Sequence, residues 1–376
     1  MNETKEFQLL GRDLDELREL VEREGQPSYR AQQLFEGLYR QRVASLEQIS
    51  TLPQEFRGTL AEKGFEVGLP SVQNKFVSRD GTVRYLMGFC DGQTVETVWM
   101  PEGDEGEAGD GTEAGDELEK GRGRDWDRAT ICVSSQVGCA VDCQFCLTAL
   151  LGVKRNLTAG ETVGQVAAVL RDQAVVPPQG RVNLVFMGMG EPFLNYDNFM
   201  SAVRLLVTGV GIPESRMTVS TAGIVPRIVD FGGEKVRPKL AISLNASNDE
   251  LRSRLMPINR KWNLEKLIMA ARSFPLRPRE KLTFEYVLLE GVNDSGANAR
   301  EVVELVRGLR GKVNLIALNP GPGIEFRTPA EERVIEFQRI LLNAGIPTFI
   351  RRPRGRDIYA ACGQLKRTTE MLPETS

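Results

Sequence analysis

The fold is decided by the stretch ATICVSSQVGCAVDCQFCLTALLG, residues 129–152, where an apolar run leads directly into three cysteines. The run at residues 129–135 is rich in β-branched and small residues, which favours a strand. Cys139, Cys143 and Cys146 follow in the spacing Cys-x3-Cys-x2-Cys. A strand that ends in a cysteine-rich loop predicts a metal or catalytic site at the end of that strand.

Downstream of this stretch the chain alternates β-rich runs with amphipathic helix patterns. Continuous apolar strands separated by helices favour a parallel sheet covered by helices. We therefore predict an α/β fold whose main part, residues 129–365, is a partial (β/α)6 barrel with its active site at the carboxyl ends of the strands. Thr158 and Glu161 predict a capping box at the start of the first helix. The further strand candidates are RVNLVFMG, RMTVST, KLAISL, LTFEYVLL, KVNLIAL and PTFIRR.

Three segments lie outside this predicted barrel. Residues 1–75 read as a small helical domain, in which Ala31, Leu34, Phe35 and Leu38 form an apolar stripe. Residues 76–128 read as a β extension interrupted at about 101–127 by an acidic, glycine-rich insertion that we expect to be disordered. Residues 102–127 contain eleven acidic and three basic residues. We expect residues 366–376 to be a disordered tail.

The composition excludes several classes of protein. The chain has no histidine, which rules out Ser-His and Cys-His catalytic pairs and the commonest zinc ligand. No apolar run approaches the roughly 20 residues of a membrane-spanning helix, and the N-terminus lacks the features of a secretion signal. We expect a cytoplasmic protein with no membrane partner. The fourth cysteine near the loop is Cys132, while Cys90 is expected in the core and Cys362 lies near the C-terminus.

Three thiolates in one loop have a specific chemical meaning. They can hold three irons of a [4Fe-4S] cubane and leave the fourth iron free to bind a small molecule. The alternatives are a structural zinc site and three unrelated buried thiols. Zinc takes four protein ligands, and this loop offers neither a histidine nor a fourth cysteine at finger spacing. The spacing therefore favours one [4Fe-4S] cluster held by Cys139, Cys143 and Cys146.

From about residue 29 to residue 365 the chain resembles the RlmN/Cfr family of radical S-adenosylmethionine RNA methyltransferases. The resemblance implies that this barrel is a radical S-adenosylmethionine barrel that uses two S-adenosylmethionine molecules per turnover. It is carried by VETVWMPE, TICVSSQVGCAVDCQFCLTALLGVKRNLTAGE, FMGMGEPFLNYDN, TVSTAGIVP, LAISLNASNDELR, PINRKWNLE, LIALNPGPG and RGRDIYAACGQL.

The resemblance also implies a mechanism for particular residues. One S-adenosylmethionine would methylate Cys362, and a second would yield a radical that activates this methyl group for addition to an adenine carbon. Cys132 would then attack the sulfur of Cys362 and form a transient disulfide. Glu96 would accept the proton lost from the adenine ring, a role that a carboxylate can fill in a chain without histidine.

By the same resemblance, seven residues bind S-adenosylmethionine, and most follow predicted strands directly. At one of them, Asn245, this chain departs from the family, which usually has histidine there. Asparagine can donate and accept hydrogen bonds but cannot carry charge, so the contact at this position is in question. The acidic insertion is also absent from the family pattern and should be dispensable. The seven residues are Gly190, Glu191, Ser220, Ser243, Leu244, Asn245 and Asn319.

The implied substrates are an adenosine in the peptidyl transferase centre of 23S rRNA and one beside the anticodon of tRNA, both methylated at carbon 2. The helical domain, residues 154–156 and the basic run RRPRGR at 351–356 are the candidate phosphate contacts. An electron donor such as flavodoxin is a further expected partner. The sequence leaves open methylation at carbon 8, as in the Cfr branch. A non-catalytic iron-sulfur RNA-binding protein and a radical enzyme acting on other substrates are more remote alternatives.

Overall fold

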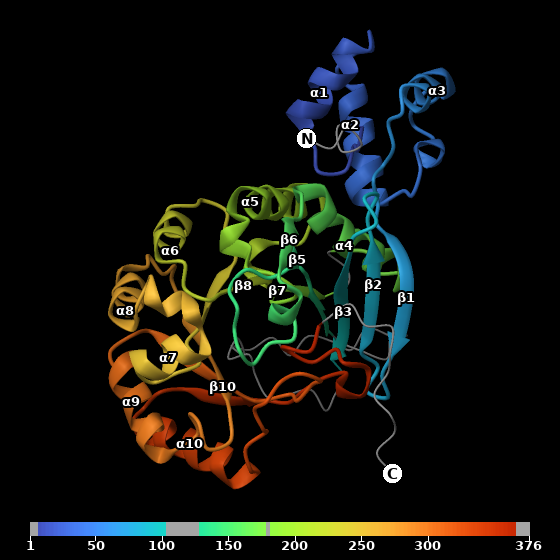
Figure 1. The fold of residues 1–376 in the computed structure, drawn as a ribbon. Helices are drawn as coiled ribbons and strands as arrows, with labels where there is room; N and C mark the ends of the chain where they lie inside the picture. Colours follow the sequence, from blue (N-terminus) through green and yellow to red (C-terminus); the bar gives the residue numbers. More distant parts are fainter. Residues whose placement is uncertain (1–6, 103–127, 178–180, 366–376) are drawn as a thin grey trace.

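The helical domain begins the part of the chain that is visible in the computed structural model, which describes residues 7–102, 128–177 and 181–365. Its helices are α1 (Leu14–Arg23), α2 (Arg30–Phe35) and α3 (Gln54–Glu62). The predicted apolar stripe is confirmed, because all four of its side chains are buried. Figure 1 shows this domain set to one side of the barrel, above β1, β2 and β3. It is fastened to the barrel by Arg42 and Arg171, since the Arg171 guanidinium donates to the Arg42 carbonyl oxygen at 2.5 Å.

A ten-stranded sheet forms the centre of the described structure, in the order β1-β2-β3-β4-β7-β8-β9-β10-β11-β12. The first four strands pair antiparallel, and β4 to β12 pair parallel in that order. The predicted parallel sheet is confirmed, and its seventh parallel strand, β12, is the predicted strand PTFIRR. The strands are β1 Ser71–Val77, β2 Val83–Gly88, β3 Thr94–Glu102, β4 Arg128–Cys132, β7 Val182–Phe186, β8 Met217–Thr221, β9 Lys239–Ser243, β10 Leu282–Leu288, β11 Gly311–Ala317 and β12 Thr348–Arg351.

The two faces of the parallel strands differ in character. One face carries large apolar side chains that pack on the outer helices, as in the ring contacts Phe186–Phe199 at 4.9 Å and Tyr286–Phe337 at 5.1 Å. Because side chains alternate along a strand, the opposite face points into the barrel. The helices are α4 Ala159–Asp172, α5 Tyr196–Leu205, α6 Val225–Gly232, α7 Asp249–Leu255, α8 Leu264–Ser273, α9 Gly296–Val306 and α10 Glu331–Asn343.

The predicted boundaries can be compared with the structure at two places. The capping box of Thr158 and Glu161 is present at the start of α4 and is confirmed. Strand β3 continues through Pro101 and Glu102, which pair with Ala129 and Arg128, so the sheet includes the first residues of the expected insertion. The rest of the acidic insertion, at 103–127, and the C-terminal tail, at 366–376, lie outside the described residues.

The segment after β12 crosses to the antiparallel edge of the sheet. The Gly355 amide donates to Asp80 Oδ2 at 2.9 Å, and Ser78 Oγ donates to Asp357 Oδ1 at 2.6 Å. These bonds join the far end of the chain to the turn between β1 and β2, across the open side of the barrel. The crossing carries the stretch that contains Cys362 back to the barrel mouth.

Candidate active site

The two ends of the cysteine loop are held together by a short antiparallel pair of strands, β5 (Gln136–Gly138) and β6 (Val153–Asn156). Gly138 has φ +82°, and a Cβ there would lie 1.7 Å from the Gly152 carbonyl oxygen. No other residue fits that approach, so Gly138 sets how closely the two ends of the loop meet. The Cys139 amide then donates to the same Gly152 oxygen at 3.1 Å.

The three loop cysteines are partly buried free thiols with the properties expected of cluster ligands. Burial raises the pKa of Cys139 to about 12, and it raises the pKa of Cys143 well above its usual value, with neighbouring thiols and Glu191 adding to both shifts. A cationic iron cluster reverses that preference by stabilising the thiolates.

The spacing of the side chains also bears on the kind of metal group. In the described part of the chain, no three Cys, Asp or Glu side chains converge on one metal ion. The charges of Cys139 and Cys146 both act on Cys143, so the three thiols lie near one another, as the ligands of one cubane would.

Cys362 lies exposed in a segment that is tied to the cysteine loop. The Leu147 amide donates to the Gly363 carbonyl oxygen at 2.8 Å, and Thr148 Oγ1 donates to the Leu365 carbonyl oxygen at 2.7 Å. Leu147 and Thr148 follow Cys146 directly in the chain. The loop that would hold the cluster therefore also positions the backbone that follows Cys362.

Cys132 ends β4 and faces Cys362. Burial raises the pKa of Cys132, the charge of the nearby Cys362 thiolate raises it further, and a backbone hydrogen bond from Met187 opposes both. The structure thus brings together two cysteines separated by most of the barrel sequence. No disulfide joins them, and none of the six cysteines, all of which lie within the described residues, forms a disulfide. Cys90, expected in the core, is instead exposed and accepts a hydrogen bond from Gln8.

Glu96 lies on β3, beside Cys132. Val98 is the register partner of Cys132, and Glu96 precedes Val98 by two residues, so all three side chains face the same side of the sheet. Glu96 is completely buried and forms an ion pair with Arg84 of β2, which is also completely buried. Sequence reasoning missed Arg84, although an arginine inside the otherwise apolar strand VRYLMG was a usable signal.

Gly190 and Glu191 form a tight turn after β7. Gly190 has φ +98°, and a Cβ there would lie 2.6 Å from the Gln136 backbone nitrogen. Glu191 is buried, and its carboxylate accepts from the Phe193 amide at 3.0 Å and the Ala222 amide at 2.7 Å. Burial raises the pKa of Glu191 to about 7, against the effect of these bonds. The Thr221 hydroxyl also donates to this carboxylate. A carboxylate has about four acceptor positions, so it keeps acceptor capacity for a ligand ammonium.

Four more of the predicted cofactor residues lie at the ends of β8, β9 and β11. Ser220 and Ser243 meet through their hydroxyls, with Oγ atoms 3.1 Å apart. Leu244 is completely buried, so the backbone is the part of this residue that a ligand can reach. Asn319 Nδ2 donates to the Cys362 carbonyl oxygen at 3.3 Å. This bond links the cofactor residues to the segment that carries Cys362.

Asn245 has a structural task of its own. It adopts φ +57°, a left-handed conformation that asparagine tolerates better than most residues. Its Oδ1 accepts from the Val287 amide at 2.9 Å, and its Nδ2 donates to Met256 Sδ at 3.3 Å. The side-chain amide therefore stabilises the β9–β10 junction through bonds to Val287 and Met256.

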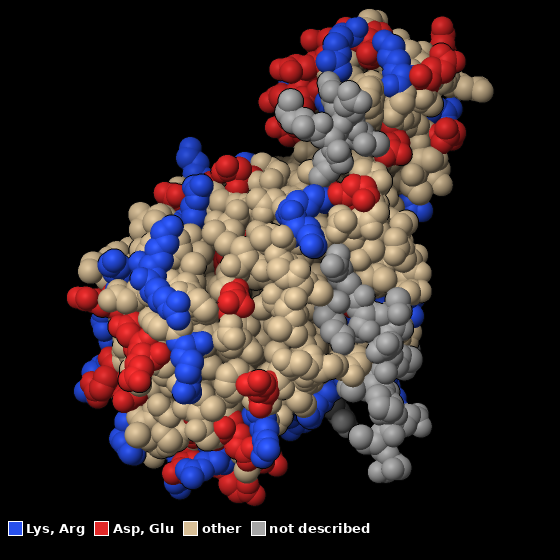
Figure 2. Space-filling model, in the orientation of Figure 1, with Lys and Arg blue, Asp and Glu red and all other residues tan. Residues whose placement is uncertain are grey.

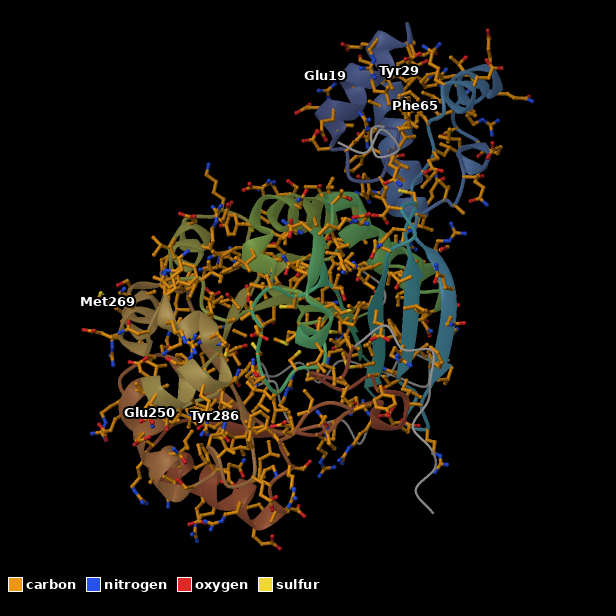
Figure 3. The ribbon with its side chains drawn as sticks, in the orientation of Figure 1. Glu19, Tyr29, Phe65, Glu250, Met269 and Tyr286 are labelled. Atoms are coloured by element: carbon orange, nitrogen blue, oxygen red, sulfur yellow. The ribbon has the colours of Figure 1, made fainter. Side chains whose placement is uncertain are left out.

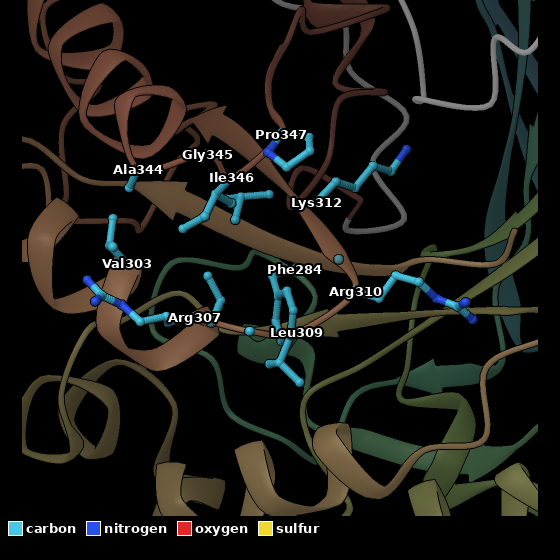
Figure 4. Close-up of a pocket in the computed structure, with 14 residues that line it drawn as sticks. Phe284, Val303, Arg307, Leu309, Arg310, Lys312, Ala344, Gly345, Ile346 and Pro347 are labelled. Carbon is cyan, nitrogen blue, oxygen red and sulfur yellow. The ribbon is translucent and has the colours of Figure 1, made fainter.

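A pocket of about 370 Å³ lies at the opposite end of the barrel. Figure 4 shows it between the end of α9 and the starts of β11 and β12, with Phe284, Leu309 and Ile346 in its lining. None of the predicted site residues lines it. The amino ends of barrel strands carry stability more often than catalysis, so this pocket is not the candidate active site.

Comparison with known proteins agrees with this geometry. Residues 133–305 match the radical SAM superfamily, and residues 7–65 match the ribosomal RNA large subunit methyltransferase N-terminal domain. A solved radical SAM methyltransferase from Sphaerobacter thermophilus is 42% identical, with a TM-score of 0.85 over 96% of this chain and 100% of that one. The chain is thus a radical SAM protein, the class that its barrel and three-cysteine loop define.

Two relatives show which family within the radical SAM superfamily this chain belongs to. A probable dual-specificity RNA methyltransferase RlmN from Koribacter versatilis is 68% identical over 93% of this chain and 98% of its own length. The dual-specificity RNA methyltransferase RlmN of Syntrophobacter fumaroxidans is 45% identical over 94% and 96%. The chain belongs to the RlmN family of radical SAM RNA methyltransferases. The predicted family, fold class and enzyme class are confirmed.

Proposed function

We propose that this enzyme methylates carbon 2 of an adenosine in the peptidyl transferase centre of 23S rRNA and of an adenosine beside the anticodon of tRNA. The observation that carries the proposal is the position of Cys362, which faces Cys132 and is tied to the cysteine loop through Leu147 and Thr148. The two relatives described above are both named dual-specificity RNA methyltransferases, which supports two RNA substrates for this enzyme.

The metal group fits the loop cysteines, and Cys139, Cys143 and Cys146 would hold it. When bound, a [4Fe-4S] cluster supplies the electron that activates S-adenosylmethionine, of which two molecules are used per turnover. Glu191, Ser220, Ser243 and Asn319, with the backbone at Gly190, Leu244 and Asn245, orient that cofactor at the barrel mouth. The cluster must also be reduced, and an electron donor such as flavodoxin would supply that electron.

The chain's own residues then carry the methyl group and move the proton. Cys362 Sγ holds the carbon next to the base, where the small residues of the AACG stretch let a base approach closely. Glu96 takes the proton from carbon 2. Cys132 Sγ attacks Cys362 Sγ, so that a sulfur–sulfur bond forms as the carbon–sulfur bond breaks. The released methylene carbon takes up a proton from solvent, and methylated adenine leaves. The Arg84 guanidinium holds the Glu96 carboxylate in place for this step.

The RNA contacts form a separate part of the proposal. Arg155 is occupied, since it donates to Asp91 at 2.5 Å and to both oxygens of Glu161. Lys154, Arg352 and Arg356 are exposed and remain the proposed phosphate contacts. The helical domain is close to neutral, with ten acidic and eight basic residues at 7–65. In Figure 2 the centre of the visible barrel face is also largely uncharged.

In the described part of the chain, no helix is both long enough and apolar enough to cross a bilayer. We propose that the enzyme acts in the cytoplasm, where rRNA and tRNA are found.

The experiment is anaerobic incubation of the cluster-loaded enzyme with methyl-labelled S-adenosylmethionine and either an rRNA fragment or tRNA, followed by mass spectrometry of the nucleosides. We expect labelled 2-methyladenosine from both RNAs and none with Cys362→Ala. Labelled 8-methyladenosine would show the Cfr-type reaction instead. If no nucleoside from either RNA carried the label, methyl transfer to these RNAs would be rejected.

A further inference from the structure

Among the inward-facing side chains of the barrel, Glu285 on β10 has no role in the proposal above. Its register partners are Ser243 on β9 and Asn314 on β11, and in a parallel pair such residues face the same side of the sheet. The next residue along, Tyr286, faces the outer helices and packs on Phe337 of α10 (Figure 3). Glu285 and Asn314 therefore point into the barrel, next to the proposed cofactor residue Ser243.

Glu285 and Asn314 are both almost completely buried, with exposed fractions of 7% and 3%. Asn314 Nδ2 donates to Glu285 Oε1 at 3.0 Å. Asn314 Oδ1 has no hydrogen-bond partner among the described residues. Because a carboxylate only accepts hydrogen bonds, the Asn314 amide cannot be turned round to satisfy this oxygen. A buried acceptor without a donor costs free energy, so this oxygen is expected to have a ligand or water as its donor.

The surroundings of Glu285 show how a buried carboxyl group is tolerated here. Burial raises the pKa of Glu285, and Arg351, the Asn314 amide and Lys312 oppose that shift. These groups come from β11 and β12. On the other side, β9 contributes the uncharged Ser243, whose hydroxyl meets that of Ser220 at 3.1 Å. The pair thus presents acceptor atoms toward the interior beside two hydroxyl groups, a set that suits a ligand rich in O–H donors.

We propose that Glu285 and Asn314 bind the ribose diol of S-adenosylmethionine, with Glu285 accepting from one hydroxyl and Asn314 Oδ1 from the other. This rests on the proposed function, which puts that cofactor against Ser220 and Ser243. Acidic side chains recognise ribose hydroxyls in the same way in other nucleotide sites. The subsite selects a ribonucleoside over a deoxyribonucleoside and fixes the rotation of the cofactor about its sugar.

The test measures binding in place of catalysis. S-adenosylmethionine and its 2'-deoxy and 3'-deoxy analogues are titrated by equilibrium dialysis into protein with an oxidised cluster, which leaves the ligand uncleaved. The wild type should bind at least one deoxy analogue roughly 10- to 100-fold more weakly than S-adenosylmethionine. Glu285→Met has no side-chain oxygen to accept from a hydroxyl, so it should weaken the binding of S-adenosylmethionine by a similar factor. This variant should also bind one of the two deoxy analogues, the one that lacks the hydroxyl facing residue 285, with no further loss of affinity.

Glu304→Met, on the exposed face of α9, is the matched control and should bind S-adenosylmethionine like the wild type. Asn314→Ser tests the same subsite from β11, and it replaces Glu285→Met if that variant lacks iron or shows no cooperative melting transition. Unchanged affinity and unchanged selectivity in both variants would overturn the inference. So would weakened RNA binding with normal S-adenosylmethionine binding, because the pair would then contact the target nucleotide. A wild type that binds no S-adenosylmethionine would instead reject the proposed function.

Discussion

The buried ion pair of Arg84 and Glu96 allows a quantitative prediction. Both side chains have an exposed fraction of 0%, and the Arg84 guanidinium also stacks on the Phe76 ring at 4.2 Å. Arg84→Met keeps much of the side-chain volume and leaves a carboxylate buried without its guanidinium. Removing one partner of such a pair costs about 3–5 kcal/mol. With a urea slope of about 3 kcal/mol per M, the unfolding midpoint should fall by about 1–1.7 M.

The assay is urea unfolding followed by circular dichroism under anaerobic conditions. The matched control is Arg307→Met, whose ion pair with Glu304 is 66% exposed on both sides and should contribute less than about 1 kcal/mol. The double variant Arg84→Met with Glu96→Gln should recover most of the lost stability, because no charge is then left buried. Equal midpoints for Arg84→Met and Arg307→Met would refute the reasoning, as would a double variant less stable than Arg84→Met alone.

Three further predictions concern the chemistry of the site. Cys132→Ser should leave Cys362 able to receive its methyl group but should stop release of the product. Enzyme and RNA should then stay covalently joined on a denaturing gel, and free methylated RNA formed at the normal rate would contradict this. Glu96→Gln should give the same joined species, since the ring proton is not removed, whereas unchanged methyl transfer would rule out the base role. Gly138→Ala places a methyl group 1.7 Å from the Gly152 carbonyl oxygen and should lower the iron content after reconstitution, while Gly58→Ala, with open space around its Cβ, should not.

Much of the fold follows from local patterns. The predicted strands of the barrel, the capping box at Thr158 and the apolar stripe of the helical domain all depend on residues close together in the sequence. The spacing of Cys139, Cys143 and Cys146 likewise identifies the loop by itself. These features are legible because the period of the apolar residues and the chemistry of a short motif are both local properties.

The remaining features come from contacts between residues far apart in the chain. The sequence does not reveal that Asp80 binds the Gly355 amide, that Arg84 pairs with Glu96, or that the Asn245 amide is used at the β9–β10 junction. The sequence prediction for Cys90 was wrong, because this residue lies in the turn between β2 and β3 and is exposed. In each case the partner is set by strand register and chain crossing, which a local pattern cannot report.

The central claim is that Cys362 carries the methyl group that reaches the RNA. The most direct test is peptide mass spectrometry of Cys362 in cluster-loaded Cys132→Ser protein, incubated with methyl-labelled S-adenosylmethionine and a reductant in the absence of RNA. The account predicts a labelled methyl group on Cys362 and none on Cys90 of the same molecules. Label that reaches RNA in the wild type while Cys362 stays unmodified in every preparation would contradict it.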